Sequence, residues 1–413
     1  MQTIAADKSD DRTIDLEKNR DNFSTLQNEN KVNMKIIFAL TLVHFTGDFY
    51  SSFSSPLMPV FVNKLSLSLA QVGFITGLVR ILSFVIQPCV GYLADRYQTR
   101  AFIFCGLLFT IVFIPLSGIA NNYYVLMLVM AIGSVGSSMF HPSVTGMVPL
   151  YSGSKKGFAL SIFNTGGTFA FGVGPIFISW YVASFGLENM PFTMAIGFVF
   201  FLICVAYIPM PVSEGFKNTG FIGSLKESIG DVWKPIALIW MVMVLRSVVA
   251  QSYMTFMPVY LSKRGHDLVS VGTIVAIFII AGTISGLISG YLSDKIGYKK
   301  IFAVSNIIMI PATLIYLYVP GNWVYLGAFI SGFFVFASLP LAVAMAQTLA
   351  PKGRSMVSSL MMGLAYGLGG VASPIVGKLA DVYSIESVLF YIAFLPLVSI
   401  VLIAKFPDVR PEE

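Results

Sequence analysis

The chain has 413 residues, of which 56% are hydrophobic and only 11% are charged, and its mean hydropathy is +0.80. A soluble globular protein carries roughly 25% charged residues, so this composition excludes a soluble protein and makes the lipid bilayer the solvent. The net charge of +6 does not indicate a nucleic-acid-binding protein, because the basic residues are distributed in the way that sets membrane orientation.

The first 33 residues mix acidic, basic and polar side chains, show no secretory signal, and are expected to form a mobile cytoplasmic tail. A helix that crosses the hydrocarbon core needs about 20 mostly apolar residues, and twelve runs of this kind follow. Their approximate limits are 34–62, 70–94, 101–120, 122–150, 157–185, 189–211, 233–261, 268–293, 299–319, 322–350, 354–382 and 386–406.

The longest connection between these runs carries five charged residues and divides the chain into six plus six helices. We therefore predict an all-α membrane protein with twelve transmembrane helices in two pseudo-symmetric six-helix bundles. The predicted units are a tail at 1–33, an N-terminal bundle at 34–212, a cytoplasmic linker at 213–232, a C-terminal bundle at 233–406 and a C-terminal tail at 407–413.

The basic residues predict the orientation of the chain. With both termini in the cytoplasm, the tails, inner loops and flanks hold 20 of the 26 Lys and Arg residues and the outer loops hold four. Basic residues are retained on the cytoplasmic side of membrane proteins. We expect a multi-pass protein of a bacterial inner membrane with both termini in the cytoplasm.

Short motifs recur at a constant offset of 199 residues. Met58-Pro59-Val60-Phe61 returns as Met257-Pro258-Val259-Tyr260, and Pro175 matches Pro374. Several matches at one offset indicate an internal duplication. Because each half holds six helices, both halves enter the membrane in the same orientation, which places a substrate site between them near the bilayer midplane.

The loop after the second helix of each half reads "GYLADRYQTR" and "GYLSDKIGYKK". Both resemble the signature loop of the major facilitator superfamily, and the resemblance covers about residues 34–406. It implies that these loops control the conformational change, although a role as orientation signals alone is the alternative. The residues assigned to conformational gating are Gly91, Asp95, Arg96, Arg100, Gly290, Asp294 and Lys295.

Three further segments resemble the fosmidomycin-resistance family of bacterial drug exporters. They are "HFTGDFYSSFSSPLMPVF" in the first helix, "GSVGSSMFHPSVTGMV" in the fourth and "GFALSIFNTGGTFAFGVGP" in the fifth. The fifth also resembles the antiporter motif that ends in Gly-Pro, but the Gly-Gly that should follow Pro175 is missing. The resemblance implies proton-coupled drug efflux, and hence antibiotic resistance.

Five strongly ionisable side chains lie well inside the spans: His44, Asp48, Arg80, His141 and Arg246. A charge at this depth costs several kcal/mol and faces a partner or a wet cavity. Asp48 is the lone deep acid, and His44 shares its helix face at i, i+4 spacing. We assign proton coupling to Asp48 and His44, with Arg80, Arg246 or a proton neutralising the carboxylate. A permanent ion pair that only fixes helix packing is the alternative.

One Asp and two Arg leave the cavity positive, and the planar guanidinium suits phosphate, phosphonate or carboxylate. An anionic or amphiphilic substrate is therefore expected. In the alternative interpretation of Arg80, its side chain reaches a membrane face. In the alternative interpretation of His141, its ring bonds the irregular backbone before Pro142. The residues assigned to substrate binding are Arg80, Arg246, His141, Tyr50, Asn164, Gln251 and Gln347, although the polar ones among them equally suit helix bridging.

The predicted function is a secondary active transporter that moves a small compound across the inner membrane by alternating access, with proton-coupled drug efflux as the first candidate. A proton-coupled importer of an organic anion or sugar is the alternative, and a non-transporting receptor or scaffold is the third. No phosphate loop or hydrolase motif occurs, so we predict no enzyme. We predict no cofactor and no metal. The expected partners are a small-molecule substrate, protons and the bilayer, for a monomer that binds no nucleic acid.

Overall fold

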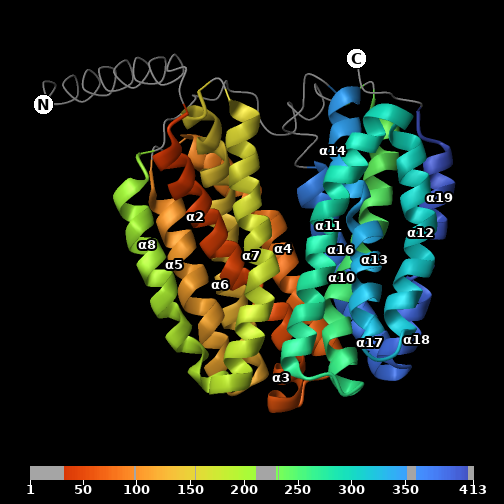
Figure 1. Ribbon diagram of the computed structural model, residues 1–413, viewed down its shortest axis with the longest axis horizontal. Helices are drawn as coiled ribbons and strands as arrows, with labels where there is room; N and C mark the ends of the chain where they lie inside the picture. The colour runs from red at the N-terminus through yellow and green to blue at the C-terminus, as the bar shows by residue number, and fades with distance from the viewer. Residues whose placement is uncertain are drawn as a thin grey trace, which may run out of the picture.

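The computed structural model describes residues 32–96, 99–153, 155–210, 229–230, 232–350 and 360–407. These residues form helices joined by short connections (Figure 1). Within these described ranges, eleven helical segments are long and apolar enough to cross a membrane, judged by length and composition. Large apolar side chains such as Leu287 and Phe192, which are 75% and 73% exposed, cover the outside of the helices, as expected for a surface that faces lipid tails.

Helix starts follow the capping residues of the sequence. Asn33 accepts a hydrogen bond from the amide of Ile36, and Asn122 accepts one from the amide of Val125. Such caps satisfy amides that have no partner inside the helix. The first six predicted runs become α2 (Met34–Ser51), α3 (Ser54–Leu65), α4 (Leu69–Arg96), α5 (Ala101–Leu116), η1 (Ser117–Ile119), α6 (Tyr123–Met147), η2 (Val148–Tyr151), α7 (Lys156–Phe185), η3 (Leu187–Thr193) and α8 (Met194–Tyr207).

The other six predicted runs form the second half of the chain. They become α10 (Trp233–Lys263), α11 (Leu268–Ile296), α12 (Tyr298–Tyr318), α13 (Trp323–Phe336), α14 (Ser338–Leu349), η5 (Leu360–Leu364), α16 (Ala365–Val371), α17 (Ser373–Val382), α18 (Ile385–Ile392) and α19 (Pro396–Ala404). The predicted run at 354–382 begins outside the described residues and continues as η5, α16 and α17. The all-helical membrane fold is confirmed. The predicted tails and most of the predicted linker lie outside the described residues.

The first spanning segment is interrupted between α2 and α3. Pro56 has no amide hydrogen, so the carbonyl of Ser52 loses its partner one turn later, and the helix is broken at Ser52 and Phe53. The hydroxyl of Ser52 donates to the carbonyl of Phe49 at 2.7 Å. The interruption places a run of serines in the middle of the protein.

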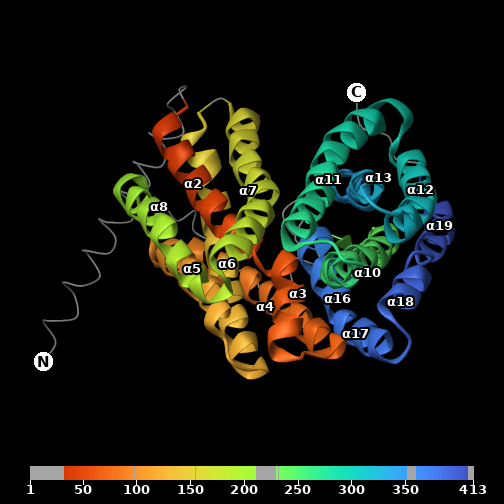
Figure 2. The same ribbon diagram turned by 60° about the horizontal axis from the view of Figure 1, so that its bottom comes forward.

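The helices before and after residue 229 form two groups that lie side by side (Figures 1 and 2). Between the groups, α4 packs against α16 and α17, and α7 packs against α11. These two contacts are related by the internal repeat: Gly73 of α4 lies against the backbone of Ser373, while Gly272 of α11 lies against the carbonyl of Pro175. Gly73 and Gly272 are equivalent under the 199-residue offset, so the duplication seen in the sequence is visible as paired helix crossings.

Hydrogen bonds join the two groups at one end of the molecule. The amides of Leu69 and Ala70 donate to the two carboxylate oxygens of Asp381, at 2.8 and 2.9 Å. The hydroxyl of Ser55 donates to the carbonyl of Met254 at 2.7 Å. Leu69 begins α4 and Asp381 lies one residue before the end of α17, at helix ends opposite both termini (Figure 1). Ser55 and Met254 lie further from those ends, since Met254 is nine residues before the end of α10. The described contacts therefore close the face of the molecule that lies away from the termini.

Candidate functional site: a histidine–aspartate triad beside a cavity

A cavity of about 430 Å³ lies between the two groups of helices, within the size range of small-molecule sites. Its wall comes from α2, α3, α4, α5, α6 and α7 on one side and from α10, α11 and α16 on the other. Four of the predicted site residues line it, namely Asp48, Arg80, His141 and Gln251. The structure thus brings a deep acid, a histidine and an arginine to a single cavity.

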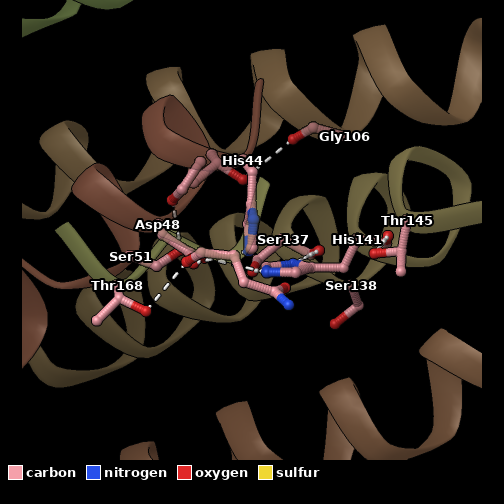
Figure 3. Close-up of polar contacts among 12 residues, drawn as sticks. His44, Asp48, Ser51, Gly106, Ser137, Ser138, His141, Thr145 and Thr168 are labelled. Atoms are coloured by element: carbon pink, nitrogen blue, oxygen red, sulfur yellow. Dashed lines mark hydrogen bonds and ion pairs between the residues drawn. The ribbon is translucent and has the colours of Figure 1, made fainter. Parts of the chain in front are cut away.

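Asp48 contacts two histidines rather than an arginine. Its Oδ2 lies 3.1 Å from Nε2 of His44, one turn earlier on α2, and its Oδ1 lies 3.0 Å from Nε2 of His141 on α6 (Figure 3). The ion pairs that Asp48 makes with described residues are these two. Asp48 is only 4% exposed. We refer to His44, Asp48 and His141 as the triad.

The other nitrogen of each imidazole contacts a main-chain carbonyl. Nδ1 of His44 lies 3.0 Å from the carbonyl oxygen of Phe163, and Nδ1 of His141 lies 2.7 Å from that of Ser137. A carbonyl oxygen only accepts hydrogen bonds, so each Nδ1 carries the hydrogen. In the neutral imidazole, Nε2 then holds a lone pair aimed at a carboxylate oxygen. Each contact with Asp48 is attractive only when a cation, such as a proton, lies between the two atoms.

The rings of the triad are held by aromatic packing. His44 stacks on Phe163 with ring centroids 4.2 Å apart, His141 stacks on Phe140 at 4.3 Å, and the two imidazoles meet edge to face at 5.1 Å. The stacked ring face and the bonded Nδ1 of each imidazole restrict its rotation. The nitrogens are therefore held in position toward Asp48.

Gly167 of α7 lets that helix pass directly behind the triad. A Cβ at this position would come within 2.6 Å of Nε2 of His44 and 2.7 Å of Oδ2 of Asp48, closer than van der Waals contact allows. Glycine is thus required for the His44–Asp48 contact and for the burial of Asp48.

The structure places more polar groups on the cavity wall than the sequence suggested. These are mainly hydroxyl and amide side chains of α3, α4, α6 and the break after α2, and they comprise Ser51, Ser52, Ser54, Ser55, Thr76, Ser83, Gln87, Ser134, Ser137 and Thr255. The polar run "YSSFSSP" inside an apolar segment is the signal that could have identified the first four. Gln87 was equally visible as an amide inside the second span.

Arg246 lies in the protein interior and is not a wall residue of this cavity. It is fully buried on α10, donates from Nη1 to the carbonyl of Val335 at 3.0 Å, and lies over the ring of Phe336 at 5.8 Å. Gln347 is half-buried on α14 and is also absent from the wall. In this conformation the arginine at the cavity is therefore Arg80.

Tyr50 and Asn164 are not wall residues of the cavity. The hydroxyl of Tyr50 is buried, donates to the carbonyl of Thr193 at 2.6 Å and accepts from the amide of Gly197 at 2.9 Å. It thereby ties α2 to η3 and α8. Asn164 is exposed on α7 and follows Phe163, whose carbonyl accepts a hydrogen bond from His44.

Most predicted gating residues cannot be placed. Gly91, Asp95, Arg96 and Asp294 lie outside the residues whose side chains the structure describes. Of the remaining three, Arg100 donates from its guanidinium to the carbonyl of Ile208, 108 residues later in the chain, at 2.9 Å. The ammonium of Lys295 lies 4.4 Å from the ring centroid of Tyr291, and Gly290 has open space around it.

Comparisons with known proteins agree with this architecture. The model of the Major Facilitator Superfamily matches residues 40–374 and also 270–413. The fosmidomycin resistance protein of Escherichia coli (strain K12) is 27% identical over 390 residues, which cover 93% of this chain and 95% of that protein. The quinolone resistance protein NorA of Staphylococcus aureus (strain MRSA252) is 29% identical over 173 residues, 40% of this chain and 43% of that protein.

Among solved structures, a bacterial homolog of the human lysosomal transporter Spinster, in an inward-facing and occupied conformation, superposes with a TM-score of 0.78 at 14% identity, covering 89% of this chain and 95% of that one. A structural match at 14% sequence identity supports a shared fold and nothing about function. Together with the repeat, the paired helix crossings and the central cavity, the family match shows that the chain belongs to the major facilitator superfamily and is a secondary transporter, not an enzyme.

Proposed function

We propose that this transporter exports a small anionic or amphiphilic compound by alternating access, coupled to protons, as a drug exporter that resembles the fosmidomycin resistance protein. The observation that carries the proposal is the cavity whose wall includes Arg80 together with Asp48 and His141 of the triad. Fosmidomycin is a small phosphonate, and the planar guanidinium of Arg80 can bind such a group through two parallel hydrogen bonds. The similarity to two resistance proteins favours efflux.

The triad supplies a proton site. Because both Nδ1 atoms donate to carbonyls, the two contacts of Asp48 hold two protons when both are attractive. Loss of the protons leaves lone pairs that face the carboxylate, and they repel it. His141 is on α6 and Asp48 is on α2, so proton release pushes these helices apart. This links the protonation of the triad to helix position.

Import of an organic anion together with protons is a second candidate, and the charge of the triad favours it. Two imidazolium rings and one carboxylate carry a net positive charge, and Arg80 adds another on the same cavity wall. An anion is held best when the protons are present. Simultaneous binding of both is the condition for symport, whereas an antiporter binds them in turn.

A pH gradient across proteoliposomes distinguishes the two directions. We expect purified protein to accumulate radiolabelled fosmidomycin on the acidic side if it is an antiporter, and on the alkaline side if it is a symporter. Accumulation on neither side, with exchange of the compound retained, would overturn proton coupling. The absence of exchange for phosphonates and carboxylates alike would overturn the substrate class.

Asp48→Asn tests the coupling role directly. The amide mimics the protonated carboxyl in charge, so we expect exchange to continue while uphill transport and substrate-induced proton movement are lost. Asp267→Asn is the matched control, because Asp267 caps α11 and is not a wall residue of the cavity. Full proton movement in Asp48→Asn would assign coupling elsewhere.

We further propose that the protein is a monomer in the bacterial inner membrane with both termini in the cytoplasm, as the distribution of Lys and Arg predicts. The closed face of the structure is then periplasmic, and the conformation is inward-facing. In a protein without native cysteines, Asn121→Cys should react with an impermeant maleimide in intact cells. Lys155→Cys should react only after lysis, and the reverse pattern would invert the topology.

A further inference from the structure

The triad has the arrangement of a metal site as well as that of a proton site. Histidines that bind metal donate their second ring N–H to a carbonyl or carboxylate, which fixes the tautomer and aims the free lone pair at the ion. His44 and His141 both donate from Nδ1 to main-chain carbonyls and both aim Nε2 at Asp48. We propose that His44, Asp48 and His141 bind a divalent transition-metal ion, with Zn²⁺ as the type, in place of two protons.

The spacing of the ligand atoms fits such an ion. One ligand atom from each of the three residues can be chosen so that all lie within 4.8 Å of one another. The Nε2–oxygen distances are 3.0 and 3.1 Å. Bonds of about 2.0–2.1 Å to tetrahedral zinc separate neighbouring ligands by roughly 3.3 Å. The two contacts with Asp48 are within a few tenths of an ångström of this spacing, but they involve different carboxylate oxygens. The remaining separation among the three ligand atoms, which is at most 4.8 Å, has to shorten for one ion to bind all three residues.

The electrostatics favour a divalent ion. One M²⁺ beside the Asp48 carboxylate carries the same net charge as two protons beside it, so the exchange leaves the charge of the buried site unchanged. Two imidazoles and a carboxylate suit zinc, nickel or copper, whereas Mg²⁺ and Ca²⁺ prefer oxygen ligands alone. The ligand set thus selects a transition metal.

The site keeps an open coordination position. Asp48 and His141 line the cavity, while His44 lies behind them against Phe163 and α7. The fourth position of a tetrahedral ion faces the cavity, where water or an oxyanion can occupy it. Metal binding removes the two lone pairs that take up protons, so Zn²⁺ inhibits any proton-coupled transport. The inference does not depend on the solute that is carried.

The chain offers a matched set of variants, because it has three histidines in total. His266 lies in the connection between α10 and α11, outside the triad. We would titrate the detergent-purified full chain, with Cys89 and Cys105 replaced by serine, with Zn²⁺ by calorimetry and with Co²⁺ by visible absorption. We expect one equivalent to bind, His266→Gln to bind equally, and His44→Gln, His141→Gln and Asp48→Asn each to bind at least about tenfold more weakly.

A second measurement identifies the metal ligands in the protein with the native triad, so the test does not depend on the folding of the variants. X-ray absorption of the Zn²⁺-loaded protein should show two imidazoles and an oxygen shell without sulfur. Binding that persists unchanged in both His44→Gln and His141→Gln, sulfur ligation, or the absence of stoichiometric binding would each overturn the proposal. Loss of fosmidomycin transport with metal binding intact would refute the proposed function alone.

Discussion

Ser55 and Met254 are 199 residues apart, occupy equivalent positions of the internal repeat, and are hydrogen-bonded to each other, with the serine hydroxyl donating to the methionine carbonyl at 2.7 Å. Two residues related by a two-fold operation can touch only near its axis. The pseudo-two-fold axis of the transporter therefore passes between α3 and α10, at the closed end of the cavity.

This contact predicts that locking Ser55 to Met254 stops transport. Alternating access requires the closed face to open when the two halves rock. In a protein without native cysteines, a Ser55→Cys, Met254→Cys pair should be cross-linked by a short bifunctional reagent, and substrate exchange should fall to background. The single variants, treated identically, serve as controls. Unimpaired exchange in the cross-linked protein would show that transport does not require the two halves to separate at this contact.

Asp381 should hold the closed face shut. Its carboxylate caps the start of α4 from the opposite half, and a cap contributes about 0.5–2 kcal/mol. Asp381→Ala should shift the equilibrium toward the conformation open at this face by roughly twofold to thirtyfold. Distances between spin labels on the two halves measure this shift. Asp267→Ala removes a cap of the same kind inside one half, on α11, and should not change the distances.

Gly167→Ala should damage the triad, because the added methyl group would overlap His44 and Asp48. We expect proton-coupled transport to be lost while the protein stays in the membrane. Gly146→Ala is the matched control, because a Cβ at Gly146 meets nothing within 4 Å. Equal transport by the two variants would show that the triad geometry is dispensable.

Tyr50→Phe should lower stability rather than substrate affinity. Its hydroxyl bonds Thr193 and Gly197, and removing it leaves a buried carbonyl and a buried amide without that partner. The cost is about 1–3 kcal/mol. Thermal unfolding in detergent should show a reduced Tm with unchanged Kd for the substrate. A reduced affinity at unchanged Tm would restore Tyr50 to the binding site.

Arg80→Lys should weaken the binding of an anion more than Arg246→Lys does. Arg80 lines the cavity, whereas Arg246 is buried and bonded to the carbonyl of Val335. An ammonium cannot supply the two parallel hydrogen bonds of a guanidinium, so we expect a loss of about tenfold or more for Arg80→Lys in ligand-binding calorimetry. The opposite ranking would place the anion at Arg246.

The sequence by itself determined the membrane-spanning helices, the duplication and the family. These depend on local apolar length, on motif spacing and on repeated residues, which are all readable along the chain. It also identified Asp48, His44 and His141 as deep ionisable groups, because the cost of charge in a bilayer makes such residues conspicuous. The i, i+4 spacing of His44 and Asp48 further predicted that they share one helix face.

Only the tertiary structure decided which of these groups meet. His141 lies on a different helix from Asp48, and helix packing, which the chain order does not encode locally, brings its Nε2 to the carboxylate while Arg246 is directed to Val335. The two histidines donate from Nδ1 to main-chain carbonyls on α6 and α7, and these bonds likewise depend on how the side chains are oriented in the folded protein. Contacts between segments far apart in sequence are fixed by packing geometry, and they bring deep polar residues that are dispersed along the chain together in one site.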